Sequence, residues 1–109
     1  MRSRNPLQVV NSVDAFGNPA GGGVEGLGLS VQWQSEPLGN PPTAPNGAFV
    51  EELIEAARQR LGFYQTAANY MFYCQENALA LTRLEEAAMW LRARRENRGA
   101  RGVQGTLTP

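Results

Sequence analysis

The sequence of 109 residues contains no histidine, no lysine and a single cysteine. Histidine is the side chain that most often acts as a general base or a metal ligand near neutral pH. One cysteine, Cys74, forms no disulfide within the chain and supplies no zinc-binding cluster. Its thiol has no histidine to activate it, so nucleophilic catalysis is not expected. We therefore predict a protein that is not an enzyme and that uses no cofactor.

The sequence also lacks a stretch apolar enough to span a bilayer, because its uncharged N-terminal regions are rich in glycine. Residues 1–6 are basic but are not followed by the apolar segment of a signal peptide. These patterns predict a protein that does not enter a membrane and that works in a reducing cytoplasm.

Charge is balanced overall but unevenly placed. Ten arginines offset ten acidic residues, and a net charge of zero argues against a general nucleic-acid coat. The dipole of a helix C-terminus accounts for part of a basic cluster near the end of the chain. The mutual repulsion of the remaining arginines calls for an anion, and phosphate is the obvious one. The cluster consists of Arg92, Arg94, Arg95, Arg98 and Arg101.

The exclusive use of arginine fits two explanations. One is a GC-rich genome, and the other is a preference for the planar guanidinium group in phosphate binding. The sequence leaves both open.

Composition divides the chain into parts. Residues 1–47 hold eight of the 12 glycines and six of the 7 prolines, whereas residues 48–98 contain no proline and one glycine. This shift predicts strands and loops followed by helices. We expect an N-terminal arm with a proline-rich linker over residues 1–46, a helical hairpin over residues 47–99 and a tail over residues 100–109.

Within the arm, apolar and polar residues alternate over residues 27–34, which predicts a half-buried strand. Residues 7–13 are a weaker strand candidate. Turn-forming residues lie between the two, at Gly17-Asn18-Pro19 and at Gly21-Gly22-Gly23. We therefore expect a small β-hairpin.

The first helix is predicted over residues 47–65. Asn46 is its expected N-cap, and Glu51 and Glu52 suit the positive end of the helix dipole. Apolar residues then recur with a period of about 3.6: Phe49, Val50, Leu53, Ile54, Ala57, Leu61 and Tyr64.

A turn over residues 66–69 should lead into a second helix over residues 73–98, which Gly99 and Gly102 should end. A short turn between two helices gives an antiparallel pair. The predicted fold is therefore α+β, with a two-helix hairpin and a small N-terminal β-hairpin arm. The main apolar stripe of the second helix is Leu81, Leu84, Ala88 and Leu91.

Further apolar residues of the second helix lie away from this stripe, namely Leu79, Met89 and Trp90. Two helices alone do not cover them, and a homo-oligomer is the natural way to complete the core.

The region between the helices holds side chains that suit a nucleotide. Asn77 lies on the stripe of Leu84 and fits either an adenine edge or a neighbouring backbone group. Glu85 and Glu86 point about 100° apart on a helix and are interpreted as solvated residues, not as a catalytic pair. Five aromatic residues fit either base stacking or packing at the bend and an oligomer interface: Phe63, Tyr64, Tyr70, Phe72 and Tyr73.

Several short strings then occur in a characteristic order. In that order they resemble a phage hairpin family that includes Thoeris anti-defence proteins and, more distantly, an anti-CBASS protein. The resemblance covers about residues 28–106. The chain departs from it in a longer turn at residues 66–71 and in a tail without the histidine that relatives often carry. The strings are Trp33-Gln34, residues 45–51, Arg60-Leu61 with Tyr64-Gln65, residues 74–77, and Leu91 and Arg94 followed by residues 98–106.

The resemblance implies a sponge, which binds a nucleotide immune signal and holds it intact. The signal would be a glycocyclic ADP-ribose for Thoeris and a cyclic di- or trinucleotide for CBASS. It further implies a homo-oligomer, either a dimer or a dimer-based hexamer, in the cytoplasm of a bacterial host. Neither a membrane nor duplex nucleic acid is an expected partner. The ligand-facing positions that it implies are Phe72, Asn77, Arg94, Arg98, Arg101 and Arg60.

Helix geometry constrains such a site. Asn77 and Arg94 are 17 residues apart, which is roughly 25 Å along one helix. A mononucleotide-sized ligand that touches both must lie between two chains, and a two-fold pairing would create two equivalent sites. Two other functions remain open, a structural or adaptor oligomer and a nucleic-acid binder that uses the basic C-terminal end.

Overall fold

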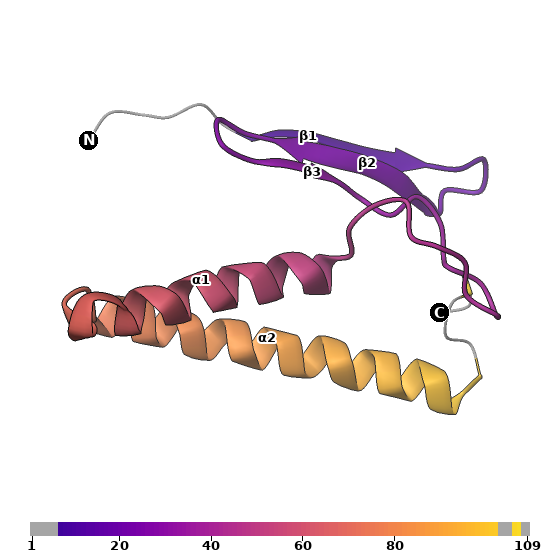
Figure 1. Ribbon diagram of the computed structural model, residues 1–109. Coiled ribbons are helices and arrows are strands. Elements are labelled where there is room, and N and C mark those ends of the chain that lie inside the picture. The colour runs from indigo at the N-terminus through magenta and orange to yellow at the C-terminus, as the bar shows by residue number, and fades with distance from the viewer. Residues whose placement is uncertain (1–6, 103–105, 108–109) are drawn as a thin grey trace. The chain divides into compact units, whose positions relative to one another are not determined.

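A computed structural model describes residues 7–102, 106 and 107 of the chain. Three strands precede two helices (Figure 1), which confirms the predicted α+β class. The chain divides into two compact units, one with the strands and the loops up to Phe49 and one spanning Val50–Gly102. Neither helix of the described residues is long and apolar enough to cross a membrane. The basic segment 1–6 and most of the expected tail lie outside the described residues.

The first unit is built on a three-stranded antiparallel sheet. Its strands are β1 (Gln8–Val13), β2 (Pro19–Glu25) and β3 (Ser30–Gln32), in the order β1-β2-β3. The strand predicted at residues 7–13 is therefore present. The strand predicted over residues 27–34 is shorter, because Gly26 and Leu29 pair their backbone groups across a tight turn.

The prediction of a turn at Gly21-Gly22-Gly23 was wrong, since these residues form the middle of β2. Gly22 has a φ of +112°, and a Cβ atom there would collide with the backbone carbonyl of Val10 on β1. Only glycine permits this close approach of the two strands. Because glycine has no side chain, the alternation typical of a strand was absent from the sequence.

Asp14 closes the turn between β1 and β2. Its Oδ1 accepts hydrogen bonds from the backbone N–H groups of Phe16 (2.8 Å) and Asn18 (3.0 Å). These donors favour the ionised carboxylate. The N–H of Asn18, followed by that of Phe16, therefore lowers the pKa of Asp14.

The loop that follows β3 is fixed by two amide side chains. Oε1 of Gln34 accepts hydrogen bonds from the backbone N–H groups of Asn46 (2.8 Å) and Gly47 (3.1 Å). Asn46 bonds in turn to the backbone and side chain of Ser35. Asn46 is therefore not the helix N-cap that was predicted, because its side chain is committed to the loop and the helix begins at Val50.

The second unit is an antiparallel pair of helices, α1 (Val50–Tyr70) and α2 (Gln75–Ala100), which lie side by side in Figure 1. Both begin two or three residues later than predicted. Helical backbone angles end before Ala67, so the turn predicted over residues 66–69 falls where α1 breaks down. Gly99 does not end α2, since the helix continues to Ala100 and the residue with left-handed backbone is Gly102, with a φ of +73°.

Gln65 joins the two helices at the bend. Its side-chain amide donates to the carbonyl of Cys74 (3.1 Å) and accepts from the N–H of Cys74 (3.2 Å). Gln65 is only 6% exposed. One side chain from α1 therefore bonds both backbone groups of Cys74, the N-cap of α2, whose carbonyl also accepts from the N–H of Ala78 (3.1 Å).

The described residues form no hydrophobic core in the single chain. No apolar side chain among them is buried, and the two buried residues, Gln65 and Arg98, are polar. The predicted stripe of α2 is half-buried. Leu79, Met89 and Trp90, which were predicted to lie off that stripe, are all exposed.

Acidification should loosen the β1–β2 turn. Because the folded pKa of Asp14 is lowered, its carboxylate stabilises the turn above the unfolded value, and this contribution is lost as the pH falls through the folded pKa. In NMR spectra, the amide shifts of Phe16 and Asn18 should titrate together below pH 3.8. Asp14→Ala should abolish this step, whereas the control Glu36→Ala should leave it. A shared midpoint at or above 3.8 would contradict the assignment.

Gln65→Ala should lower the free energy of unfolding by about 1–3 kcal/mol, because the N–H of Cys74 loses its partner and the carbonyl of Cys74 keeps only its bond from the N–H of Ala78. Gln65→Glu should also destabilise the chain at neutral pH, since a carboxylate cannot donate to the carbonyl. Gln59→Ala, an exposed change on α1, should alter stability by no more than about 0.5 kcal/mol. Urea unfolding at one fixed chain concentration measures all three, and equal effects of Gln65→Ala and Gln59→Ala would refute the role of this pairing.

Candidate functional site

The bend between α1 and α2 carries an open, apolar hollow. Its lining combines the last helical turn of α1, the connecting segment and the first turn of α2: Phe63, Tyr64, Ala67, Phe72 and Asn77. Two of the predicted ligand positions, Phe72 and Asn77, are thus brought together. Phe63 and Tyr64 were named from the sequence only as residues that fit base stacking or packing, and Ala67 was not singled out for the site.

Asn77 is the amide side chain of this hollow. It is half-buried, and its backbone N–H donates to the thiol of Cys74 at 3.4 Å. Its side-chain amide has no hydrogen-bond partner among the described residues, and it is not sealed from solvent. An amide in an apolar wall offers a donor and an acceptor in one plane, which suits the edge of a nucleobase.

Arg60 lies beside the hollow and over its aromatic wall. The guanidinium carbon is 5.2 Å from the ring centroid of Phe63 and 4.9 Å from that of Tyr64. Its Nε donates to the hydroxyl of Tyr64 at 3.2 Å. These cation–π contacts hold a positive charge at the rim. The spacing of Arg60, Phe63 and Tyr64 on one helix is the sequence signal that could have revealed this group.

The connection between the helices is strained and exposed. Ala68, Asn69 and Tyr70 have φ values of 52°, 57° and 68°, in the left-handed region that non-glycine residues rarely adopt. The next residues leave their apolar side chains in solvent. Phe63 and Tyr64 form the ring contact in the described part of the chain, with centroids 6.3 Å apart. Aromatic packing therefore does not close the bend within one chain, whereas base stacking and an oligomer interface both stay predictions for these residues.

The arginines predicted near the end of α2 occupy different environments. Arg94 is exposed, and no described residue pairs with it. Arg101 is exposed as well and donates through Nε to the side chain of Asn97 at 3.0 Å. Arg98 is only 8% exposed. Of the three, Arg94 and Arg101 therefore present a guanidinium group to a molecule in solution.

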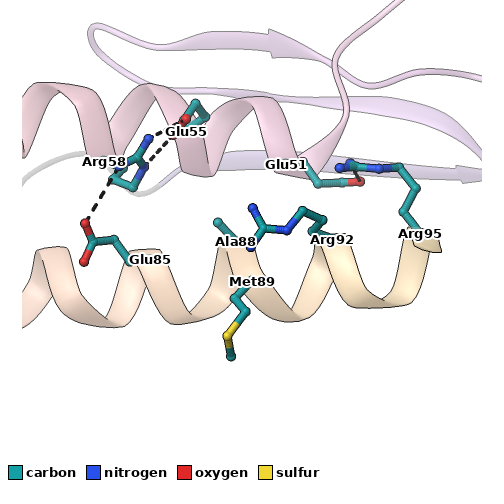
Figure 2. Close-up of a pocket in the computed structure, with 8 residues that line it drawn as sticks. All are labelled: Glu51, Glu55, Arg58, Glu85, Ala88, Met89, Arg92 and Arg95. Carbon is teal, nitrogen blue, oxygen red and sulfur yellow. Dashed lines mark hydrogen bonds and ion pairs between the residues drawn. The ribbon is translucent and has the colours of Figure 1, made fainter. Parts of the chain in front are cut away.

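A second depression runs between the helices near the start of α1 and is shown in Figure 2. Arg58 binds Glu55 through two nitrogens at 2.6 and 2.7 Å and approaches Glu85 on α2 at 3.8 Å. The hydrogen bond from Arg58 lowers the pKa of Glu55, and Glu55 raises that of Arg58. Glu85, which was interpreted as a solvated residue, is exposed and also lines this depression.

The same depression accounts for part of the basic cluster. Arg95 pairs with Glu51 of the same chain at 3.9 Å, so this arginine has a structural partner. Arg92 points between the helices in Figure 2. The lining contains three arginines and three glutamates and is electrically balanced, which makes it a poor site for an anion.

The predicted site residues thus form two groups. Phe72, Asn77 and Arg60 lie at the bend, whereas Arg94, Arg98 and Arg101 lie at or beyond the other end of α2. Seventeen residues of continuous helix separate Asn77 from Arg94, roughly 25 Å. One small ligand therefore does not reach both groups within a single chain. In the described part of the chain, no cluster of acidic or cysteine side chains is arranged to hold a metal ion.

Comparison with known proteins identifies relatives of the helical unit. A family model described as the Acb2/Tad1 hairpin domain matches residues 37–96, which include all of α1 and most of α2. The chain is also 49% identical over 61 residues to Thoeris anti-defense 1 of Bacillus phage SBSphiJ7. That match covers 56% of this chain and 41% of the relative, so the chain spans less than half the length of that protein. The sheet, Arg98 and Arg101 lie outside the residues that the family model matches. Because the model matches more than half of the sequence, the chain belongs to the Acb2/Tad1 hairpin domain family.

Proposed function

We propose that this chain is a phage-type anti-defence protein that binds a cyclic nucleotide immune signal in the host cytoplasm and holds it without degrading it. The observation that carries the proposal is the apolar hollow at the bend, whose wall holds the side-chain amide of Asn77 with no hydrogen-bond partner among the described residues. Family membership and the anti-defence relative support the same role. Glycocyclic ADP-ribose is the first candidate signal, and the cyclic di- and trinucleotides of CBASS are the second.

Each group has a physical task in this proposal. The aromatic side chains around Phe72 stack on a base, which is worth about 1–3 kcal/mol per base. The amide of Asn77 bonds the edge of that base. Guanidinium groups bind the phosphates through charge-assisted hydrogen bonds. None of these tasks breaks a covalent bond, which fits a sponge and not an enzyme.

Because the bend group with Asn77 and the arginine group with Arg94 lie too far apart for one ligand, the proposed site needs a second copy of the chain. The bend of one hairpin would lie beside the end of α2 of its partner, so that Asn77 of one copy and Arg94 of the other face one ligand. Two-fold symmetry then yields two equivalent sites. The exposed apolar residues of α2, and the lack of a buried apolar side chain among the described residues, support such an assembly, as a dimer or a dimer-based hexamer.

The function is tested by ligand release. Protein incubated with glycocyclic ADP-ribose, a cyclic dinucleotide or a cyclic trinucleotide is freed of unbound ligand and then heated, and the released molecules are identified by mass spectrometry. We expect intact ligand in amounts proportional to protein. A modified product, or loss of ligand with substoichiometric protein, would show an enzyme instead. Release of none of the three would favour a structural or adaptor oligomer.

Asn77→Ala and Arg94→Ala should each weaken binding of the released ligand about ten- to hundredfold, since a hydrogen bond to a charged group is worth roughly 1.5–3 kcal/mol. Arg94 is exposed, so its truncation should change stability by no more than about 0.5 kcal/mol. Isothermal titration measures the affinities. Arg83→Ala is the matched control, because Arg83 is an exposed arginine of α2 that pairs with Glu86.

Mixing the two variants tests whether the site spans two chains. In a mixed dimer, one site collects both unmodified side chains and the other collects both substitutions. Titration of the mixture should therefore recover a fraction of tight sites that neither variant has alone. If subunit exchange is confirmed and no tight fraction appears, the two residues do not share a site.

A further inference from the structure

The sheet of the first unit has one open edge. Strand order places β1 and β3 at the two edges. The β3 edge is engaged by the chain itself, because the N–H of Ala48 donates to Gln32 (2.7 Å) and the N–H of Gln34 donates to Ala48 (2.9 Å). In the described chain no strand lies on the far side of β1.

The register shows which backbone groups this edge presents. The N–H of Trp33 donates to the carbonyl of Gly22, and Gly26 pairs with Leu29, so even-numbered residues of β2 bond to β3. Gly23 and Glu25 therefore bond to their β1 partners, Val10 and Gln8. It follows that the backbone groups of Val9 and Asn11 point outward, away from the sheet.

The usual protection of an edge strand is missing from β1. Its sequence, Gln-Val-Val-Asn-Ser-Val, contains neither a charged residue nor proline, and all six residues are exposed. Edge strands in natural proteins are normally shielded by charges or proline, or are covered by another segment. The register of β1 against β2 shifts between Asn11 and Val13, so the outward backbone groups of Val9 lie in the regular part of the strand.

The two faces of the sheet differ. Residues directly opposite each other on neighbouring strands share a face, which puts Val9, Val24 and Val31 in one row across all three strands. The other face carries Gln8, Glu25 and Ser30 beside the exposed Val10, and Ser30 donates to Glu25 at 3.2 Å. An apolar face of only three strands is thus left half-exposed.

We propose that the open edge of β1 pairs with the same edge of a second copy of this chain, in antiparallel orientation. Because β1 carries no charge, two copies of it do not repel each other. The same lack of charge gives β1 no electrostatic preference for an acidic or basic strand of another protein. A two-fold axis perpendicular to the sheet keeps both apolar faces on the same side. The product is a continuous sheet of six strands, three from each copy, with twice the apolar face.

This interface differs from the pairing of helices proposed for ligand binding. It uses residues outside the segment that the family model matches. It therefore adds a second contact through which copies of this chain associate, and it does not depend on any ligand.

Val9→Pro tests the proposal, because it removes an outward N–H without removing a hydrogen bond to β2. At a concentration at which the wild-type chain is assembled, we expect light scattering to give the Val9→Pro variant about half the wild-type mass. Ser30→Pro, at the first residue of the other edge strand, is the matched control and should keep the wild-type mass. An unchanged mass for a folded Val9→Pro chain would overturn the proposal.

Hydrogen exchange on the unmodified protein gives a second readout, which decides the matter if Val9→Pro misfolds. In the assembled protein the amides of Val9 and Asn11 should be protected, although they have no acceptor in their own sheet. On dilution they should lose protection before those of Gln8 and Val10. Fast exchange of Val9 and Asn11 in the assembled protein, beside protected neighbours, would refute the pairing.

Discussion

The hairpin depends on the pairing between one side-chain amide and the backbone N–H and carbonyl of one residue. Gln65 satisfies both backbone groups of Cys74, and in doing so it fixes where α1 stops and where α2 starts. The strained residues Ala68–Tyr70 are tolerated because this pairing closes the chain around them. The hollow that contains Phe72 and Asn77 lies against this joint. A polar contact therefore positions the candidate site, in a unit whose apolar side chains are all partly exposed to solvent.

Much of the helical unit could be predicted from the sequence, because side chains that recur every 3.6 residues report directly on a helix face. The sheet was harder. Gly21-Gly22-Gly23 has the composition of a turn, and only the close approach to Val10 explains why it forms a strand. Asn46 has the identity and position of an N-cap. Its actual partner, Ser35, is 11 residues away in the sequence, and local rules do not detect such a contact.

The chemistry of the candidate site could be proposed from the sequence, but the surroundings of each arginine could not. Asn77, Phe72 and the arginines could be named as suitable for a base and a phosphate, and the length of the second helix already separated Asn77 from Arg94. The environments of the arginines could not be read from charge alone. Arg95 is paired across the helices, Arg98 is buried and Arg94 is in solvent. Those differences depend on contacts in the folded chain, which the sequence positions of identical side chains do not reveal.

The absence of a buried apolar side chain among the described residues has a thermodynamic consequence. When folding is completed by association, dissociation and unfolding are linked, and the melting temperature rises with protein concentration. Thermal data from two samples are then comparable only at equal concentration. A ligand held between copies would raise the melting temperature by the same linkage. The amount of protein made in a cell would then set both how much signal is captured and how long each copy stays folded.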